Sequence, residues 1–311
     1  MGCELRIIRR ARIASFQHEL ETVHVALSNN DQQPQQIELF VRIYRGQICW
    51  CDVARCDLPE REWAAWRIAQ RAGIPLPHTY WHGWFDDVAV AVQQKMPDKT
   101  LWQVRNPLLI RQSSELLATL HKAHVNEKDR APLADMCLSS VLERLNECAA
   151  ESRDDLSIRS VRFLRTRSAD IQERPAVFLH GDYHPGNLFA DGRRLTAVID
   201  WEDSSCGDPR FDLATMDTYL RRCHGLGGWL RRKETNRLAD LFLESYRDVT
   251  GWNVGPLQFW KRLLDVGSVV VARWIKHRAK LGLPYPRTEP RIWYRVGNEA
   301  ENRVRRWADS T

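Results

Sequence analysis

The chain contains little glycine and proline, with 16 glycines and 14 prolines among its 311 residues. Collagen-like and low-complexity chains need far more of both, so those classes of protein are excluded. Hydrophobic residues make up 43% of the chain, which is enough for a substantial core and excludes a disordered protein. The length exceeds that of a typical small domain, and it suits two lobes or one large enzyme fold.

Long hydrophobic runs are also missing. No stretch reaches the roughly 18 apolar residues of a membrane-spanning helix, and the first residues lack the apolar segment of a secretory signal. The eight cysteines are scattered, apart from Cys49, Cys51 and Cys56, whose spacing to nearby histidines fits no standard zinc pattern. We therefore expect reduced thiols, no membrane association and a cytoplasmic protein.

The net charge of +6 is unevenly distributed. Residues 219–311 carry 19 Lys/Arg against 9 Asp/Glu, whereas residues 1–218 carry 27 against 31. The basic excess falls on helical patterns, for which a solvated helix face is the ordinary explanation. A uniformly basic chain would indicate nucleic-acid binding. Because the charge of this chain is not uniformly basic, we expect no nucleic-acid partner.

The order of the predicted elements divides the chain in two. Residues 22–27, 37–44 and 88–94 are rich in β-branched and aromatic residues, and residues 59–72 have helical spacing, which predicts a region of strands with one helix. Further helices are expected at about 107–124, 133–152, 155–169, 209–224, 231–250, 256–281 and 289–307. They are interrupted by short strands near 176–179, 188–190 and 195–199, with an Asp191-Gly192 turn. These patterns predict a small β-rich lobe (1–97), a larger helical lobe (98–311) and a ligand crevice between them.

The short strands hold the densest group of polar residues in the chain. His180-Gly181-Asp182 is followed after four residues by Asn187, and Asp200 comes at the end of the next strand. Phosphoryl transfer needs a carboxylate to orient the attacking hydroxyl, and oxygen ligands to hold Mg²⁺ on the phosphates. Asp182 can supply the first, and Asn187 and Asp200 the second. The spacing equals that of the protein-kinase catalytic loop, with glycine in place of arginine.

The string H-G-D-x-H-P-G-N, followed by I-D-W-E at Ile199–Glu202 and by G-D-P-R-F-D-L-A at 207–214, resembles the aminoglycoside phosphotransferase family. That family has a protein-kinase-like fold and includes choline, homoserine and other small-molecule kinases. The resemblance covers most of the chain. It implies an α+β fold with a small β-rich N-terminal lobe and a larger, mainly helical C-terminal lobe.

The resemblance also implies roles for individual residues. Asp182 would be the catalytic base, Asn187 and Asp200 Mg²⁺ ligands, and Arg42 the phosphate-binding residue, anchored by Glu62. Arginine replaces the usual lysine there, but its permanent charge still suits a phosphate. The resemblance further implies Asp212 as a structural brace and Gln94 and Met96 as the nucleotide-binding hinge. From the residues themselves, we expect His180 to brace the loop and His184 to be either an acceptor contact or a structural residue. Glu202 and Asp203 are either acceptor contacts or solvated surface charges.

One departure from the family pattern concerns the nucleotide loop. No glycine occurs between Gly2 and Gly46, so residues 14–21 replace the glycine-rich turn that lets a backbone approach phosphates closely. This leaves ATP and GTP both open, and it keeps a non-catalytic or atypical protein-kinase-like nucleotide-binding module as an alternative. A metal-hydrolase triplet formed by His180, Asp182 and His184 is a weaker alternative, because it leaves Asn187 unexplained.

The predicted function is therefore transfer of a nucleotide γ-phosphoryl group to a hydroxyl of a small molecule. An aminoglycoside, another amino alcohol or a sugar would each fit. Residues 182–217 contain 8 Asp/Glu and 3 Arg, an acidic balance that suits Mg²⁺ and a cationic acceptor.

Overall fold

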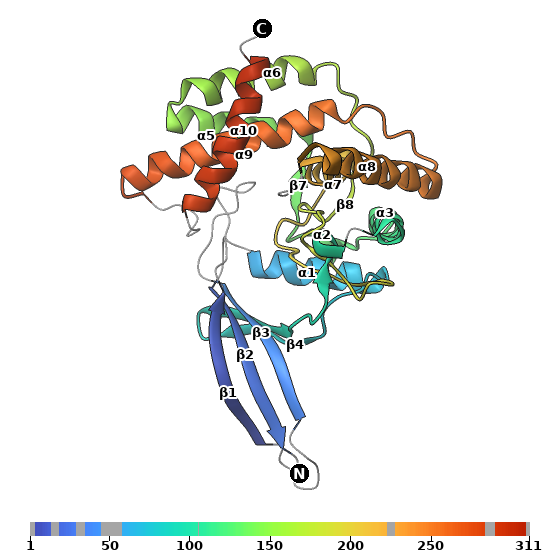
Figure 1. Cartoon of the computed structure of the whole chain (residues 1–311). Helices are drawn as coiled ribbons and strands as arrows, with labels where there is room; N and C mark the ends of the chain where they lie inside the picture. The colour runs from blue at the N-terminus through green and yellow to red at the C-terminus, as the bar shows by residue number, and fades with distance from the viewer. Residues whose placement is uncertain are drawn as a thin grey trace.

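A computed structural model describes residues 4–13, 19–28, 35–44, 58–104, 106–222, 228–283 and 290–308. The N-terminal region is built on a five-stranded antiparallel sheet in the order β1-β2-β3-β5-β4. Its strands are β1 (Glu4–Ile13), β2 (Glu19–Ser28), β3 (Gln35–Tyr44), β4 (Thr79–Phe85) and β5 (Val88–Gln94). Helix α1 (Leu58–Arg71) lies between this sheet and the helical region (Figure 1).

The sequence predicted one strand after α1, and the structure has two. β4 and β5 form an antiparallel hairpin whose turn contains Asp86, with a left-handed backbone (φ 53°) that aspartate tolerates. β4 was missed because His82 and Gly83 interrupt its alternation of apolar and polar residues, although the strand is rich in aromatic residues.

The C-terminal region is mainly helical, and its long helices agree with the predicted segments. They are α3 (Pro107–His121), α5 (Leu138–Ser152), α6 (Asp155–Ser168), α7 (Arg210–Arg222), α8 (Gly228–Thr250), α9 (Gln258–Lys280) and α10 (Pro290–Ala308), with the short helices α2 (Leu101–Val104) and α4 (Glu127–Arg130). Asn106 and Asp154 cap α3 and α6 by accepting backbone N–H groups, which explains where these helices begin.

Two small sheets lie among these helices. β9 (Leu188–Ala190) and β10 (Leu195–Val198) form the hairpin predicted from Asp191-Gly192, and β6 (Lys99–Thr100) extends it. β8 (Val177–Leu179) pairs with β11 (Ser205–Gly207), which in turn pairs with β7 (Ala134–Met136). β6, β7 and β11 were not predicted, since strands of two or three residues are defined by their partners rather than by a local pattern.

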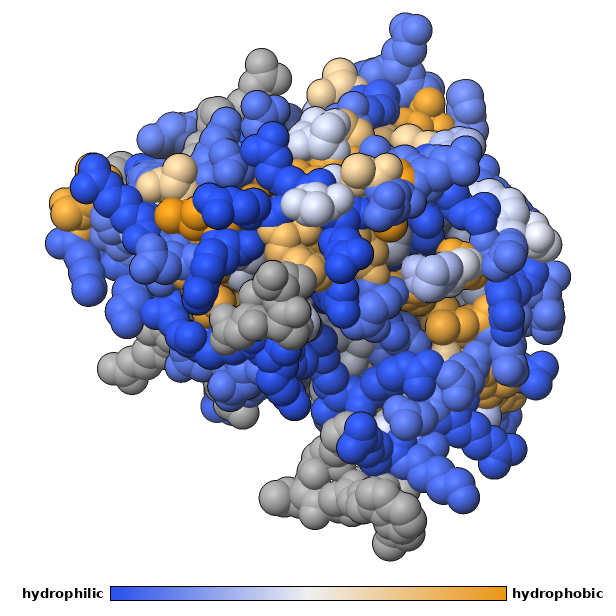
Figure 2. Space-filling view, turned by 90° about the horizontal axis from the view of Figure 1, so that it is seen from above, coloured by the Kyte–Doolittle hydropathy of each residue, from blue (hydrophilic) through white to orange (hydrophobic). Residues whose placement is uncertain are grey.

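The end of the molecule formed by the helical region has a mainly polar surface (Figure 2). Figure 2 shows that the face seen from the helical end is covered mainly by hydrophilic side chains, with scattered hydrophobic ones. No helix in the described ranges is long and apolar enough to cross a bilayer. Cys137, Cys148 and Cys206 are free thiols, and the Cys49–Cys51–Cys56 cluster lies outside the described residues.

Candidate active site

The loop from His180 to Asn187 connects β8 to β9 and carries most of the predicted site residues. Its tight path requires glycine at position 181, where φ is 86°. A Cβ atom there would lie 2.0 Å from the backbone oxygen of Asp203, so any other residue would push the two segments apart. The close approach holds the loop against the segment that contains Asp200, Glu202 and Asp203.

Asp212, on the first turn of α7, holds the start of this loop. Its carboxylate accepts the backbone N–H groups of His180 (2.8 Å) and Gly181 (2.9 Å) and lies 3.3 Å from His121 Nε2. The side chain is fully buried. Removing a buried carboxylate that satisfies several donors typically costs about 3 kcal/mol or more. The contacts therefore fit the bracing role expected for Asp212.

His180 connects the loop to the strand that leads to Asp200. Its Nδ1 accepts the backbone N–H of Asp182 (3.2 Å), so its Nε2 carries the hydrogen and donates it to the Ile199 carbonyl (3.0 Å). Burial lowers the pKa of His180, against the opposing effects of Asp212, Asp182 and Asp200. The imidazole is thus a neutral structural link with a defined tautomer.

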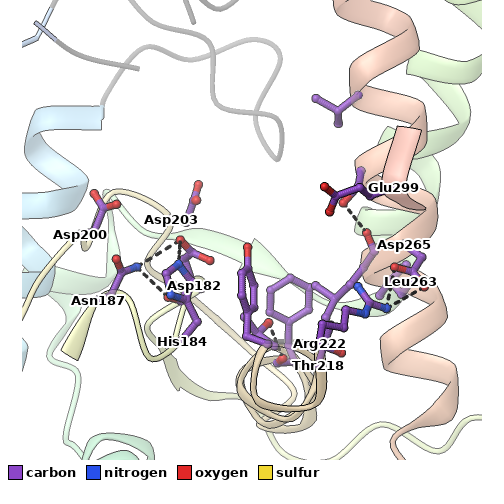
Figure 3. A pocket seen from close by; sticks show the side chains of 18 of the residues that line it. Asp182, His184, Asn187, Asp200, Asp203, Thr218, Arg222, Leu263, Asp265 and Glu299 are labelled. Atoms are coloured by element: carbon purple, nitrogen blue, oxygen red, sulfur yellow. Dashed lines mark hydrogen bonds and ion pairs between the residues drawn. The ribbon is translucent and has the colours of Figure 1, made fainter. Parts of the chain in front are cut away.

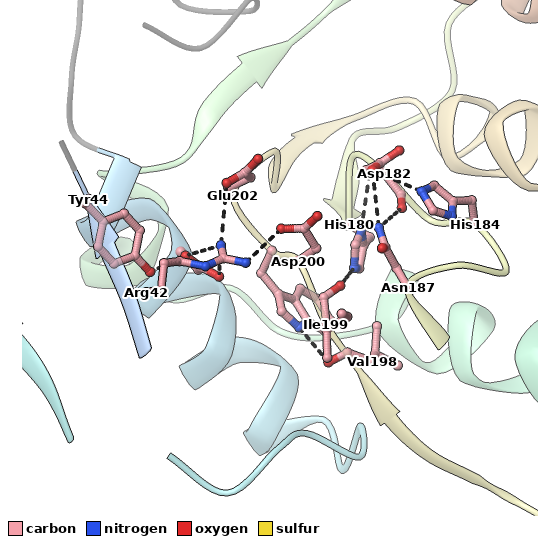
Figure 4. A network of polar contacts seen from close by, with 12 residues as sticks. Arg42, Tyr44, His180, Asp182, His184, Asn187, Val198, Ile199, Asp200 and Glu202 are labelled. Carbon is pink, nitrogen blue, oxygen red and sulfur yellow. Dashed lines mark hydrogen bonds and ion pairs between the residues drawn. The ribbon is translucent and has the colours of Figure 1, made fainter. Parts of the chain in front are cut away.

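Asp182 lies at the centre of the loop, and one of its carboxylate oxygens is held by neighbours (Figure 4). His184 Nε2 lies 3.3 Å from Oδ2, and the Asn187 amide nitrogen donates to the same oxygen over 3.2 Å. Burial opposes ionisation of the carboxyl, but His184 and the other neighbours outweigh it and lower the pKa of Asp182. The group is therefore an ionised carboxylate in a fixed orientation, as a catalytic base must be.

His184 contacts the Asp182 carboxylate and lies at the wall of a cavity. Its Nδ1 accepts the backbone N–H of Gly186 (2.9 Å), its Nε2 faces Asp182, and its ring stacks on Tyr219 with 4.3 Å between centroids. The ring also lines the cavity described below. His184 thus orients Asp182, and its ring forms part of the cavity wall.

Asn187 and Asp200 come together across the β9–β10 hairpin. Besides its bond to the Asp182 carboxylate, the Asn187 amide nitrogen donates to the Asp182 carbonyl (3.0 Å), so the amide oxygen is the atom left for a cation. Asp200 adopts a left-handed backbone (φ 69°), which is uncommon for a residue with a side chain and typical of functional sites.

Arg42 joins the sheet to these carboxylates. Its Nη1 contacts the Glu62 carboxylate of α1 (2.8 and 3.0 Å) and Glu202 (3.5 Å), and its Nη2 contacts Asp200 (3.0 Å). The expected Arg42–Glu62 pair is therefore present, and Tyr44 also donates to Glu62. Arg42, Glu62 and Glu202 are buried. Glu202, expected to contact the acceptor, has its carboxylate at Arg42 (Figure 4).

The charge balance around Arg42 favours the binding of a further cation. One guanidinium faces three carboxyl groups, so negative charge is in excess. Burial, and next the charge of Asp200, raises the pKa of Glu202 well above its usual value despite the attraction of Arg42. Among the described residues, no three His, Cys, Asp or Glu side chains form a metal cage. Mg²⁺ commonly takes one or two protein carboxylates and completes its shell with phosphates and water, and Asn187 with Asp200 fits that mode.

The hinge residues lie away from this group. Gln94 ends β5, and its backbone N–H already donates to the His78 carbonyl (2.8 Å), while that of Lys95 donates to Glu38 (3.1 Å). Neither Gln94 nor Met96 lines the cavity beside Asp182. The glycine-free segment that replaces the nucleotide loop lies mostly outside the described residues, which omit 14–18.

A cavity of about 590 Å³ opens beside Asp182. One side is acidic, with Asp182, Asp200, Glu202 and Asp203. Figure 3 shows Arg222, Asp265 and Glu299 across the cavity from the catalytic loop. Arg222 and Arg303 both bond the Asp265 carboxylate, at 2.9 and 2.8 Å, which fixes that wall.

Two aromatic rings complete the wall next to Asp182. Trp102 of α2 and Tyr219 of α7 lie 6.1 Å apart at their ring centroids, and each remains more than a third exposed. The backbone N–H of Trp102 donates to the carbonyl of Pro185, which ties α2 to the catalytic loop. The sequence analysis missed this wall because its residues lie on separate helices, with no shared local motif.

A family model for the phosphotransferase enzyme family (APH) matches residues 20–254. The chain belongs to this family. It is 25% identical over 237 residues to the aminoglycoside 3'-phosphotransferase of Niallia circulans, across 72% of this chain and 85% of that protein. The match confirms the predicted family and the predicted activity of a small-molecule phosphotransferase.

Solved structures confirm the protein-kinase-like fold. A thermostable mutant of aminoglycoside phosphotransferase APH(4)-Ia, in ternary complex with AMP-PNP and hygromycin B, is similar at a TM-score of 0.64 and 12% identity, covering 98% of this chain and 94% of that one. The amicoumacin kinase hAmiN, in complex with AMP-PNP, Ca²⁺ and Ami, is similar at a TM-score of 0.63 and 12% identity, covering 94% and 88%.

Proposed function

We propose that the protein transfers the γ-phosphoryl group of ATP to a hydroxyl of a small, cationic molecule. The observation that carries the proposal is the Asp182 carboxylate, held through Oδ2 at the edge of the cavity, next to the Arg42–Asp200 cluster. The family membership and the relative in Niallia circulans support an amino alcohol or amino sugar as acceptor.

In this reaction the acceptor oxygen attacks the γ-phosphorus, the bond from that phosphorus to the β–γ bridging oxygen breaks, and ADP leaves. Asp182 orients the acceptor hydroxyl through Oδ1 and takes its proton. Arg42 neutralises phosphate charge, and Glu62 holds the guanidinium in place. Asn187, through its amide oxygen, and Asp200 would hold Mg²⁺, which supplies further charge neutralisation when bound. The lobes, 1–97 and 98–311, would meet at the nucleotide.

The acidic side of the cavity supports a cationic acceptor. Four acidic residues line it near the reacting centre, and they favour an acceptor that brings positive charge. The complexes of related enzymes with hygromycin B and with Ami fit an acceptor of comparable size. Asp203 would then contact the acceptor, whereas the Glu202 carboxylate contacts Arg42.

Nucleotide consumption tests the proposal. The purified protein is incubated with ATP or GTP, with Mg²⁺, and with a panel of aminoglycosides, macrolides, choline, homoserine and sugars. We expect ATP-dependent phosphorylation of an aminated acceptor, identified by mass spectrometry as one added phosphate. If no nucleotide raises the melting temperature and no acceptor is phosphorylated, the proposed phosphoryl transfer is ruled out.

The aromatic wall gives a separate prediction. Replacing Trp102 with alanine should raise the KM for the acceptor about two- to twelvefold, because an aromatic contact contributes about 0.5–1.5 kcal/mol. The KM for ATP should stay unchanged, because the ring lies on the acceptor side of Asp182. The matched control is Trp81→Ala, which removes another exposed indole, on β4 and outside the cavity. Equal effects of the two substitutions would contradict a role for Trp102 in acceptor binding.

A further inference from the structure

Helix α1 carries a pair of arginines that face the helical region. Arg67 Nε donates to Oδ1 of Asp129 (2.8 Å), and Arg71 Nη2 contacts Oδ2 of the same carboxylate (2.6 Å). The two arginines are four residues apart and therefore share a face of α1. Asp129 belongs to α4, which follows α3 in the C-terminal region, so this contact joins the two halves of the protein.

The contact is asymmetric. Asp129 has only 3% of its side chain exposed, whereas Arg67 and Arg71 have 42% and 45%. Its own backbone N–H is satisfied by Asn126, the capping residue of α4. Burial opposes ionisation of Asp129, but the two arginines outweigh it and lower its pKa. A buried carboxylate with each oxygen on a different arginine specifies where α1 lies on the C-terminal region.

A second contact holds the chain that follows α1. The backbone N–H of Val198 donates to the carbonyl of Pro75 (2.8 Å). Val198 ends β10, two residues before Asp200. The C-terminal end of α1 therefore contacts the C-terminal region at Asp129. The segment that follows α1 contacts the same region near Asp200. The N-terminal half of the same helix carries Glu62, the partner of Arg42.

We propose that Asp129 is a positioning residue for nucleotide binding: through Arg67 and Arg71 it sets α1, and hence Glu62 and Arg42, at the distance from Asp200 that a triphosphate requires. The inference rests on the proposed function, since it assigns Arg42 to the phosphates. α1 is a regular helix of 14 residues, so a displacement at Arg67 and Arg71 reaches Glu62 without being absorbed on the way.

Calorimetric titration of the full chain with two probes tests the inference. AMP-PNP with Mg²⁺ has phosphates for Arg42 to contact, and adenosine has none. Asp129→Asn should weaken AMP-PNP binding about five- to tenfold, which is within the usual range for coupling through a packed network. The affinity for adenosine should stay within about twofold of wild type. A purely structural role would lower the melting temperature and change binding of both probes equally, or of neither.

Three further variants complete the experiment. Arg42→Gln should weaken AMP-PNP at least as much as Asp129→Asn does. Glu151→Gln, which removes a carboxylate bonded to Trp274 within the C-terminal region, should change neither probe. The double substitution Arg67→Gln/Arg71→Gln, on half-exposed side chains, should reproduce the effect of Asp129→Asn and replaces that variant if it does not fold.

The experiment distinguishes a wrong proposed function from a wrong role for Asp129. Wild-type protein that binds neither probe overturns the proposed function and this inference with it. A different outcome is that Arg42→Gln loses AMP-PNP binding selectively while the double arginine variant and Asp129→Asn bind both probes like wild type. That outcome overturns the role of Asp129 and leaves the proposed function standing.

Discussion

Replacing Asp182 with asparagine should lower kcat by about 10³-fold while the affinity for nucleotide stays nearly constant. General base catalysis contributes about 10²–10⁴-fold, and asparagine keeps the size of the side chain but cannot take the proton. The residue lies on the acceptor side of the cluster, so the contacts of Arg42 are unaffected. Steady-state kinetics and AMP-PNP titration measure the two quantities.

A matched control for this substitution is Asp203→Asn, which changes a carboxylate of the same cavity outside the Asp182–His184–Asn187 contacts. It should affect mainly the KM for the acceptor. A kcat of Asp182→Asn within about tenfold of wild type, or roughly 1.4 kcal/mol of barrier, would rule out the assigned role.

The pH dependence of wild-type activity follows from the same carboxylate. Because the pKa of Asp182 is lowered from 3.8, the ionised form that can accept a proton is retained as the pH falls through the usual carboxyl range. The acid limb of kcat caused by Asp182 should therefore lie below pH 3.8. His184→Gln removes the largest favourable contribution to this shift and should move the limb to higher pH.

Asp200→Asn should lower Mg²⁺-dependent turnover by about 10³-fold or more. Asp200 is the only carboxylate among the proposed Mg²⁺ ligands, and the metal neutralises phosphate charge in the reaction. The substitution also weakens the contact from Arg42, so AMP-PNP affinity should fall as well, unlike in Asp182→Asn. Chelation of Mg²⁺ from wild-type protein should reproduce the loss of activity, and adding the metal back should restore it. Full activity of the chelated enzyme would contradict a metal site at Asn187 and Asp200.

The local features of the site could be predicted from the sequence. The spacing of Asp182, Asn187 and Asp200 specifies a loop, a hairpin and a strand end, and each is set by neighbouring residues such as Gly181 and the Asp191-Gly192 turn. The long helices were also predictable, because their apolar periodicity extends over several turns.

The tertiary features could not be predicted in this way. The Trp102–Tyr219 wall and the Asp129 contacts join elements that are distant in the chain, and nothing in the local pattern of either partner indicates the other. Glu202 illustrates the same point, because its position two residues after Asp200 was compatible with facing the acceptor. Only the tertiary fold, which brings β3 next to the segment after β10, places Arg42 beside it.

In the proposed reaction, the position of Arg42 among three carboxyl groups would link the binding of metal and nucleotide thermodynamically. A triphosphate that engages this guanidinium would displace it from Asp200 and Glu202, and without a divalent ion the Asp200 carboxylate would face the incoming phosphates as a like charge. Metal and nucleotide should therefore strengthen each other's binding, and by reciprocity by the same factor. We expect the carboxylates around Arg42 to make the ligand-free site selective for the metal–nucleotide complex over either component alone.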